Sequence, residues 1–250
     1  AYYPVDDLLE SRLLSIQSAL DAAFADRLGS GEVRPAISVA RVAGEDWGSA
    51  WKQHYHVDHV GRRIVIVPSW IEYTPAAGEV VVLLDPGEAF GTGQHESTRG
   101  CIIALEEFVM PGASVLDVGC GSGVLSIASA QLGAANVVGI DIDTVAVSVA
   151  ANNVATNKVA DRATILQGDL AGGVLQEFDI VVANILSDVV IELMLELPRM
   201  LAPGGRFVCS GFTGTHAARV EEALHGAGHR IIRRIQVDDW VTLVSAAESF

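Results

Sequence analysis

Cysteine is scarce in this chain, which has three cysteines among 250 residues, Cys101, Cys120 and Cys209. They are widely spaced and form no Cys-x-x-Cys pair, so the sequence offers neither a disulfide framework nor a zinc knuckle. Isolated thiols suit a reducing compartment. We therefore expect a cytoplasmic protein.

Long uninterrupted apolar runs are also missing. The apolar stretch over residues 178–197 is broken by Asp179, Asn184, Asp188 and Glu192, which a membrane span of about 20 residues would not tolerate. No secretory signal pattern opens the chain. We expect a protein without a membrane anchor. Because the chain starts at Ala1 and enters a helical pattern almost at once, we also expect that part of the natural N-terminus precedes it.

Basic residues are outnumbered, with 16 Lys and Arg against 31 Asp and Glu and a net charge of −15. Such a field repels the phosphates of nucleic acids and favours a basic partner, although an acidic balance can equally serve solubility alone. We expect no direct contact with nucleic acid. No feature of the sequence indicates an oligomeric state.

The first 60 residues have the pattern of a small, partial α+β domain with a linker. Apolar residues recur at spacings of three and four over residues 6–28, which predicts an amphipathic helix. Residues 37–42 alternate as a short strand does, and residues 45–59 are interpreted as a connector.

Residues 61–250 form the second predicted domain. β-Branched and apolar residues predict strands over 63–68 and 79–85. Five further strands, each followed by helical periodicity, are predicted over 114–118, 136–142, 163–167, 178–185 and 206–210. This alternation is typical of a parallel sheet with both faces covered by helices. Strands 230–237 and 240–246 are joined by only two residues, so they must form an antiparallel hairpin.

A glycine-rich turn follows the strand at 114–118, because residues 115–123 read Val-Leu-Asp-Val-Gly-Cys-Gly-Ser-Gly before a helix predicted over 124–132. The backbone of such a turn can approach a ligand closely, and N–H groups at the helix start can point at it. The next strand ends near Asp141, 22 positions after Gly119. There a carboxylate commonly accepts hydrogen bonds from ribose hydroxyls.

Three interpretations of this turn compete: a nucleoside cofactor site, a dinucleotide site and a purely structural turn. The dinucleotide fingerprint Gly-x-Gly-x-x-Gly requires glycine at position 124, where this chain has Val124. The spacing favours a nucleoside cofactor without a pyrophosphate.

These residues resemble the first motif of class I methyltransferases. Gly168 and Asp169, after the third strand, resemble the adenine-contacting position of that family, with an ordinary loop carboxylate as the alternative for Asp169. The resemblance implies an α/β fold with a seven-stranded Rossmann-like sheet that ends in the antiparallel hairpin. It also implies S-adenosyl-L-methionine as the cofactor.

Two more segments narrow the resemblance. Residues 89–99 form a glycine-rich loop before a helix that begins near Ser97, a composition that suits a loop closing over a ligand. Asn184 stands where the fourth strand should end, the edge at which open α/β sheets bind ligands. With residues 116–123, 139–141 and 182–186, these segments closely resemble the PrmA family, bacterial enzymes that methylate amines of ribosomal protein L11.

The resemblance assigns roles to individual residues. Contacts to the cofactor are implied for Thr98, Gly119, Gly121, Asp141, Asp169 and Asn184. Asn184 would also be the catalytic residue facing the acceptor nitrogen, in a mouth shared with Phe90, Thr98 and Ile185. Many amino-methyltransferases have Asn-Pro-Pro-Tyr here, but this chain has Asn-Ile-Leu-Ser at 184–187, which favours an aliphatic amine over a stacked nucleobase.

The expected function is therefore transfer of methyl groups from S-adenosyl-L-methionine to lysine or N-terminal amines of a basic ribosomal protein. Residues 1–60 would belong to the part of the family that grips this substrate. Two alternatives are a methyltransferase for lysines of another protein and an NAD-dependent oxidoreductase. A third is a binding module without turnover.

Residues 54–59 read His-Tyr-His-Val-Asp-His, a pattern of binuclear zinc hydrolases. Its surroundings do not match that fold, and His216, His225 and His229 are predicted on or near one exposed helix at 215–228. We expect a solvated connector and no metal site. His95 is a candidate general base, with helix capping or loop packing as the alternative.

Overall fold

The computed structural model describes Ile16 and residues 55–85, 87, 89, 91–170 and 176–248. The residues from Tyr55 onwards form one compact unit. The helix predicted over 6–28 lies outside the described residues except for Ile16, which is helical, and the strand predicted over 37–42 lies entirely outside them. The division of the chain near residue 60 stays a prediction.

A small three-stranded sheet opens the described region, with strands in the order β1-β2-β3. Its strands are β1 (Asp58–Val60), β2 (Ile64–Pro68) and β3 (Val80–Leu84). β2 pairs antiparallel with β1 and parallel with β3, and all five of its residues are buried. The strands predicted over 63–68 and 79–85 are confirmed. The connector predicted over 45–59 is wrong at its end, because Asp58 and His59 pair with β2.

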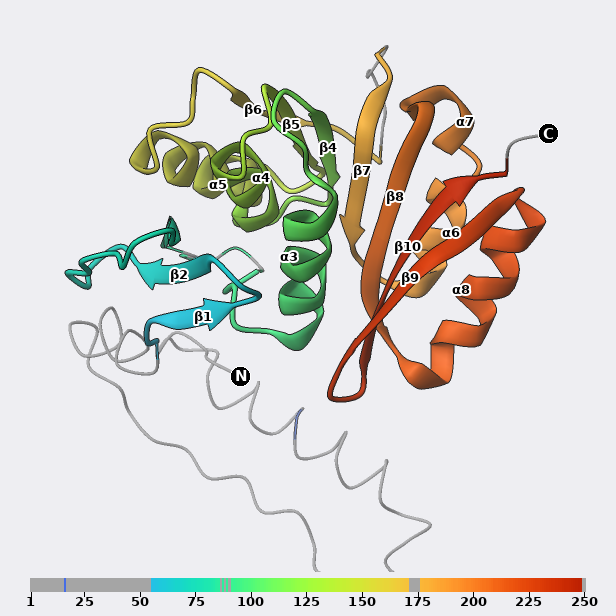
Figure 1. The fold of residues 1–250 in the computed structure, drawn as a ribbon, viewed down its shortest axis with the longest axis horizontal. Helices are drawn as coiled ribbons and strands as arrows, with labels where there is room; N and C mark the ends of the chain where they lie inside the picture. Colours follow the sequence, from blue (N-terminus) through green and yellow to red (C-terminus); the bar gives the residue numbers. More distant parts are fainter. Residues whose placement is uncertain are drawn as a thin grey trace, which may run out of the picture. The chain divides into compact units, whose positions relative to one another are not determined.

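The large sheet has seven strands in the order β6-β5-β4-β7-β8-β10-β9 (Figure 1). They are β4 (Ser114–Val118), β5 (Asn136–Asp141), β6 (Ala163–Gln167), β7 (Phe178–Asn184), β8 (Leu201–Thr213), β9 (His229–Val237) and β10 (Trp240–Ala247). The first five strands of this order are parallel, and β10 is antiparallel to both of its neighbours. The predicted seven-stranded α/β fold and its terminal hairpin are confirmed.

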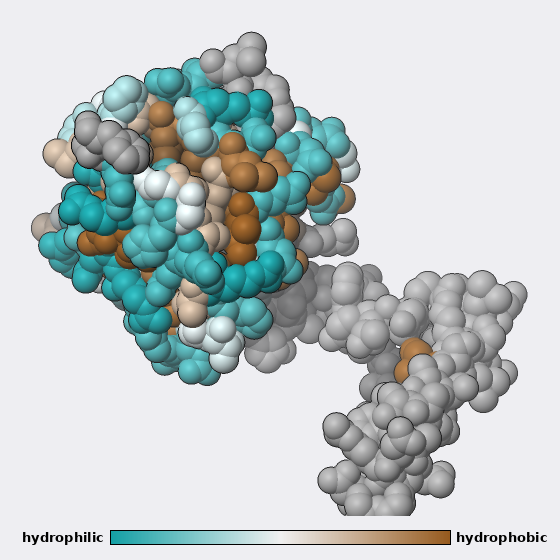
Figure 2. Space-filling model, turned by 90° about the vertical axis from the view of Figure 1, so that its right-hand side faces the viewer, coloured by the Kyte–Doolittle hydropathy of each residue, from teal (hydrophilic) through white to brown (hydrophobic). Residues whose placement is uncertain are grey.

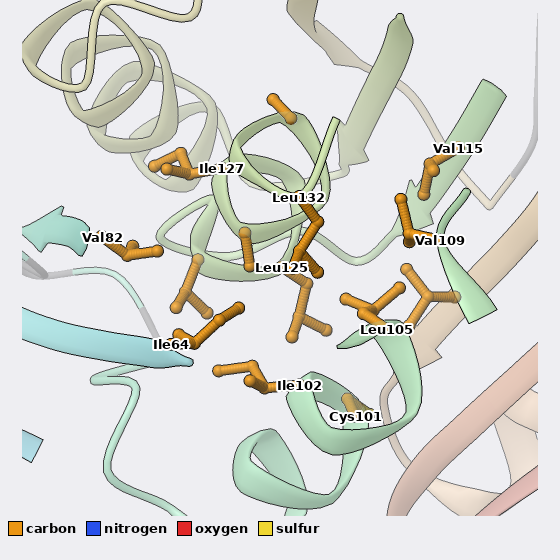
Figure 3. Packing of buried hydrophobic residues seen from close by; sticks show 14 of the residues in the cluster. Ile64, Val82, Cys101, Ile102, Leu105, Val109, Val115, Leu125, Ile127 and Leu132 are labelled. Atoms are coloured by element: carbon orange, nitrogen blue, oxygen red, sulfur yellow. The ribbon is translucent and has the colours of Figure 1, made fainter. Parts of the chain in front are cut away.

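Six helices of the described region flank this sheet: α3 (Glu96–Phe108), α4 (Val124–Gln131), α5 (Thr144–Thr156), α6 (Ser187–Leu193), α7 (Leu197–Met200) and α8 (Gly214–Gly226). Helices α3, α4 and α5 cover one face, and α6, α7 and α8 cover the other. Successive residues of β4 alternate between the two cores, since Val115 packs on the first and Leu116 on the second. Figure 3 shows Ile102 and Leu105 of α3 beside Leu125 of α4 in the first core.

The small sheet joins the first core and is held there by side chains of two helices. Ile64 and Val82 belong to that core (Figure 3). The Glu106 carboxylate of α3 accepts three backbone hydrogen bonds from residues 62–64, at 2.7, 2.7 and 3.0 Å. Just after α5, Asn157 exchanges two hydrogen bonds with the backbone of Leu83, at 2.8 and 2.7 Å. This anchoring fixes where the chain leaves β3 for the glycine loop.

Large exposed hydrophobic side chains are few on the described surface. Figure 2 shows one face, on which hydrophilic residues surround a narrow hydrophobic band. The exposed large hydrophobics are Met110, Ile142, Val145, Leu166, Leu186 and Leu195. None of the described helices has the length and apolar character needed to cross a membrane.

Two of the three later histidines lie where the sequence predicts them, because His216 and His225 are exposed on α8. The prediction for His229 is wrong. This residue begins β9, is 5% exposed and shares a hydrogen bond of 3.2 Å with Ser245 of β10. Because β9 begins only three residues after α8 ends, the His229 side chain lies in the sheet and not on the helix surface.

Candidate functional site

A cavity of about 500 Å³ opens at the carboxyl edge of the large sheet, where β4, β5 and β7 end. The strand order reverses at β4, because β5 and β6 lie on one side of β4 in the sheet and β7 and β8 lie on the other. Ligands of open α/β sheets bind at such switch points, in pockets of about 300–1,000 Å³. Gly119, Gly121, Asp141, Asp169 and Asn184, to which the resemblance assigns cofactor contacts, all line this cavity.

The turn after β4 requires glycine for steric reasons. Gly119 and Gly121 have φ angles of +71° and +54°, a region that side chains rarely adopt. A Cβ atom on Gly119 would stand 2.5 Å from Cγ2 of Ile185. Glycine here therefore lets the segment after β7 lie against the turn.

The backbone N–H groups of this turn are largely satisfied within the protein. Those of Gly119 and Cys120 donate to the carbonyl of Ile140 at 2.8 and 2.9 Å, and that of Gly123 donates to Cys120 at 2.8 Å. The N–H of Gly121 donates to Asp141. These four N–H groups are therefore engaged within the protein and are not free to bind a pyrophosphate. They lie before α4 (Val124–Gln131), so the prediction that N–H groups at the helix start point at the ligand stays a prediction.

The carboxylate of Asp141 is fixed at the end of β5 by two backbone donors. Its Oδ2 accepts from the N–H of Gly121 at 2.8 Å, and its Oδ1 accepts from Asp143 at 3.0 Å. Each oxygen keeps a second acceptor position. The Asp141 carbonyl accepts from the N–H of Gly168 at 3.0 Å, which brings Gly168 and the exposed Asp169 to the same end of the cavity. This end of the cavity can therefore bind a diol at the carboxylate and, next to it, a planar ring with polar groups on its edge.

Apolar side chains make up most of the wall at that end. Val118 and Ile140 come from the strand ends, while Ile142 and Leu170 come from the following loops. Ile142 is 66% exposed, so its side chain is available to a ligand. An apolar wall with a few placed polar groups suits a heteroaromatic base.

Asn184 ends β7 with one half of its amide unpaired. Its Nδ2 donates to Oγ1 of Thr98 on α3 at 3.2 Å, whereas its Oδ1 is buried without a hydrogen-bond partner among the described residues. A buried acceptor without a donor costs about 1–3 kcal/mol. The oxygen is therefore suited to receive an N–H group from a ligand. Thr98 is 1% exposed and stands outside the cavity lining, so it holds Asn184 from behind.

His95 caps the N-terminus of α3, which fits the helix-capping alternative. Its Nδ1 accepts from the N–H of Ser97 at 3.2 Å and lies 2.8 Å from the Ser97 hydroxyl. A neutral imidazole whose Nδ1 accepts a hydrogen bond carries its proton on Nε2. Taking up a proton at Nδ1 would break the cap beside the positive end of the helix dipole. The geometry argues against His95 as the general base.

Trp240 forms the wall next to His95, and no motif in the sequence pointed to it. The two rings meet edge to face, with centroids 4.4 Å apart and an interplanar angle of 75°. Trp240 begins β10, and the reversed direction of that strand brings it to the carboxyl edge of the sheet. Leu186, Val189 and Gly211 complete this end of the cavity.

A buried acid, Asp117, lies behind the glycine turn. Its Oδ2 accepts from the Ser126 hydroxyl of α4 at 2.6 Å, and its Oδ1 has no partner within the described part of the chain. Burial raises the pKa of this carboxyl to about 7. Side chains of a strand that is covered on both faces are buried, so the burial of Asp117 could have been predicted from its position in the strand.

The described residues of the histidine motif take part in separate contacts. Asp58 pairs with Arg99, and Nδ1 of His59 lies 3.5 Å from Glu79. The carbonyl of His56 accepts from the Gln94 side chain at 3.2 Å. Within the part of the chain that the structure describes, no group of three or more His, Cys, Asp or Glu could hold a metal ion. His54 and Phe90 lie outside the described residues.

Comparison with known proteins gives concordant results. The family model of ribosomal protein L11 methyltransferase (PrmA) matches residues 8–248. The ribosomal protein L11 methyltransferase of an Exiguobacterium species is 46% identical over 218 residues, which cover 87% of this chain and 69% of the relative. That of Bacillus subtilis is 40% identical over 246 residues, covering 98% and 78%.

A solved structure shows the same similarity. The crystal structure of ribosomal protein L11 methylase from Lactobacillus delbrueckii subsp. bulgaricus matches with a TM-score of 0.74 and 32% identity. The match covers 78% of this chain and 100% of that one.

Proposed function

Because the chain belongs to the PrmA family of ribosomal protein L11 methyltransferases, we propose that it methylates amines of ribosomal protein L11, on lysine side chains, the N-terminus or both. The observation that carries this proposal is one cavity that joins the fixed carboxylate of Asp141 to the unpaired amide oxygen of Asn184. The first group suits a nucleoside and the second suits an amine.

The residues at the first end fit S-adenosyl-L-methionine. The two oxygens of Asp141 would accept the ribose hydroxyls, and Ile140 and Leu170 would pack around the adenine with Asp169 at its edge. The Gly119 turn leaves room for the methionine part, which carries no phosphate. When bound, the cofactor supplies a methyl group made electrophilic by its sulfonium.

Asn184 would orient the acceptor amine at the other end. Its Oδ1 can accept one N–H bond from a neutral amine, which leaves the nitrogen lone pair free to face the methyl group. Thr98 holds the amide in this orientation through Nδ2. Positioning of the two reactants is the main contribution asked of the protein, because methyl transfer needs no covalent intermediate on it.

The acceptor must lose a proton before it attacks. The pKa of a lysine side chain is about 10.4 and that of an α-amine is about 8, so both groups are mostly charged at neutral pH. Burial against Ile185, Leu186 and Trp240 would favour the neutral amine. Since His95 has its Nδ1 engaged in the helix cap, we assign the proton to water.

The surface after Asn184 favours an aliphatic acceptor. Leu186 lines the cavity and is 73% exposed. The next residue, Ser187, stands where the Asn-Pro-Pro-Tyr pattern has its aromatic residue. A long, flexible amine side chain can pass such a residue without stacking. The net charge of −15 favours a basic protein as the bearer of that amine and disfavours nucleic acid. A ribosomal substrate would place the reaction in the cytoplasm.

Labelled transfer tests this proposal directly. The chain is incubated with methyl-labelled S-adenosyl-L-methionine and the total proteins of the large ribosomal subunit, and mass spectrometry locates the label. We expect label on amines of ribosomal protein L11. Label on lysines of another protein would support the alternative substrate, and absence of transfer to any protein would refute the proposal.

A further inference from the structure

Asp117 is buried directly behind the proposed cofactor site. It is the fourth of five residues of β4, it is 1% exposed, and the two residues after it, Val118 and Gly119, line the cavity. Its Oδ2 is held by the Ser126 hydroxyl, for which Gly139 makes room, because a Cβ there would stand 2.8 Å from that hydroxyl. Its Oδ1 is a buried oxygen without a partner in the described structure.

No positive group of the described chain balances this acid. The ionisable groups that face it are two thiols and one carboxylate: Cys101 on α3, Cys120 in the glycine turn and Asp141 at the end of β5. On its α4 side it faces the hydroxyl and the backbone N–H of Ser126, and its sheet partners Gly139 and Val182 carry no charge. Burial raises the pKa of the Cys101 thiol to about 12 and that of Cys120 above its usual range, so both thiols are neutral. None of the ion pairs found among the described residues includes Asp117.

The ligands proposed for this site differ by one unit of charge. S-adenosyl-L-methionine carries a sulfonium, whereas transfer of the methyl group leaves a neutral thioether in S-adenosyl-L-homocysteine. An ionised carboxylate in a low-dielectric region interacts with a nearby charge much more strongly than one in water does. Both ligands carry the same α-ammonium and α-carboxylate, so the charge of Asp117 acts differently on them only through the sulfonium.

We propose that Asp117 makes the site prefer the sulfonium cofactor over its thioether product, and that binding of the cofactor expels a proton from this buried carboxyl. The inference rests on the proposed function. By linkage, a cation that favours ionised Asp117 is bound more tightly by ionised Asp117, and its binding drives ionisation.

The direction of the pH dependence follows from the pKa of about 7 in the ligand-free protein. Below that pH Asp117 is mostly protonated, so the preference is weak and cofactor binding releases up to one proton. Above that pH Asp117 is already charged, so the preference is full and little proton is released. The preference should therefore rise between about pH 6 and pH 8 and then level off.

Calorimetry tests the inference on the whole chain. Dissociation constants of both ligands are measured from about pH 6 to pH 8.5 in two buffers with different ionisation enthalpies, which reports the number of protons released. For the unaltered chain we expect the ratio of the product's Kd to the cofactor's Kd to rise about five- to tenfold across this range. We expect fractional proton release with the cofactor and none with the product.

Two variants and one control separate charge from structure. Asp117→Asn keeps an oxygen for the Ser126 hydroxyl but should show a flat ratio and no proton release. Ser126→Ala removes the side-chain hydrogen bond but keeps the backbone hydrogen bond of Ser126, both of which favour the ionised form, so the rise in the ratio should move to higher pH while Asp117 remains. Asp161→Asn alters an exposed acid that pairs with its neighbour Arg162, and this variant should behave as the unaltered chain.

A flat ratio in the unaltered chain, with both ligands bound, would overturn the inference and leave the proposed function intact. The same holds if Asp117→Asn, verified as folded by circular dichroism, keeps the pH-dependent ratio and the proton release. If Asp117→Asn does not fold, an unmoved pH midpoint in Ser126→Ala overturns the inference instead. If neither ligand binds to the unaltered chain, the proposed function and the inference both fail.

Discussion

At the scale of single residues, the two polar atoms of the Asn184 amide have different roles: one binds the protein and the other is left for a ligand. Its nitrogen is bonded to Thr98, and its oxygen is buried and unpaired by any described residue. The Asn184→Ala substitution should lower kcat by about 100-fold or more, as loss of one placed polar group does in other active sites. Cofactor affinity should change by less than about threefold, because the unpaired oxygen is assigned to the amine. Equal losses in kcat and in cofactor affinity would contradict this role.

Thr98 should act through Asn184 rather than through the cofactor. The Thr98→Val substitution keeps the shape of the side chain but removes the acceptor for Nδ2, so the amide loses its fixed orientation. We expect kcat to fall about tenfold, a loss near the upper end of one hydrogen bond, with KM for the cofactor little changed. Thr98→Ser should restore kcat. A Thr98→Val enzyme whose main defect is cofactor affinity would show that Thr98 contacts the cofactor after all.

At the scale of elements, the turn between β4 and α4 needs Gly119 both for its positive φ angle and for the close approach of Ile185. Gly119→Ala would combine a φ of +71° with a contact of 2.5 Å to Ile185. Gly112 is a matched control, because it has a φ of +88° and a Cβ placed on it would meet no described atom within 4 Å. Both substitutions should lower stability by about 1 kcal/mol through the backbone. Only Gly119→Ala should weaken cofactor binding, by at least about tenfold, in paired thermal-denaturation and calorimetric measurements.

Comparable losses of cofactor affinity in Gly112→Ala and Gly119→Ala would show that backbone strain alone explains the effect. The contact with Ile185 would then have no part in shaping the cavity, and the proposed packing of the β7 end against the turn would be wrong.

The elements that could be predicted from sequence are those with local signals. The turn at 119–123 follows an apolar strand, Asp141 and Asn184 end two others, and the carboxyl ends of parallel strands share one edge. Trp240 could not be found this way, because its place depends on the pairing of β10 with β8, a contact between distant segments. The same limit applies to Thr98, because its contact with Asn184 depends on how α3 packs on the sheet.

At the scale of the whole molecule, the acidic charge and the proposed basic substrate lead to a dependence on salt. With a net charge of −15, encounter with a basic protein should be accelerated by long-range attraction, which salt screens. Raising the salt concentration from about 0.05 M to about 0.5 M should increase KM for ribosomal protein L11 by at least about threefold. A short peptide acceptor with one amine and no other charge is the control, and its KM should change little. A KM for ribosomal protein L11 that falls or stays constant with salt would contradict electrostatic recognition.

The central claim is that the cavity at the carboxyl edge of the large sheet holds S-adenosyl-L-methionine, with its reactive end toward Asn184. A crystal structure of the chain grown with this cofactor tests the claim most directly. We predict electron density for the ribose against Asp141 and for the sulfonium on the Asn184 side of the Gly119 turn. An empty cavity in crystals grown with saturating cofactor, or a cofactor bound elsewhere on the protein, would contradict this claim.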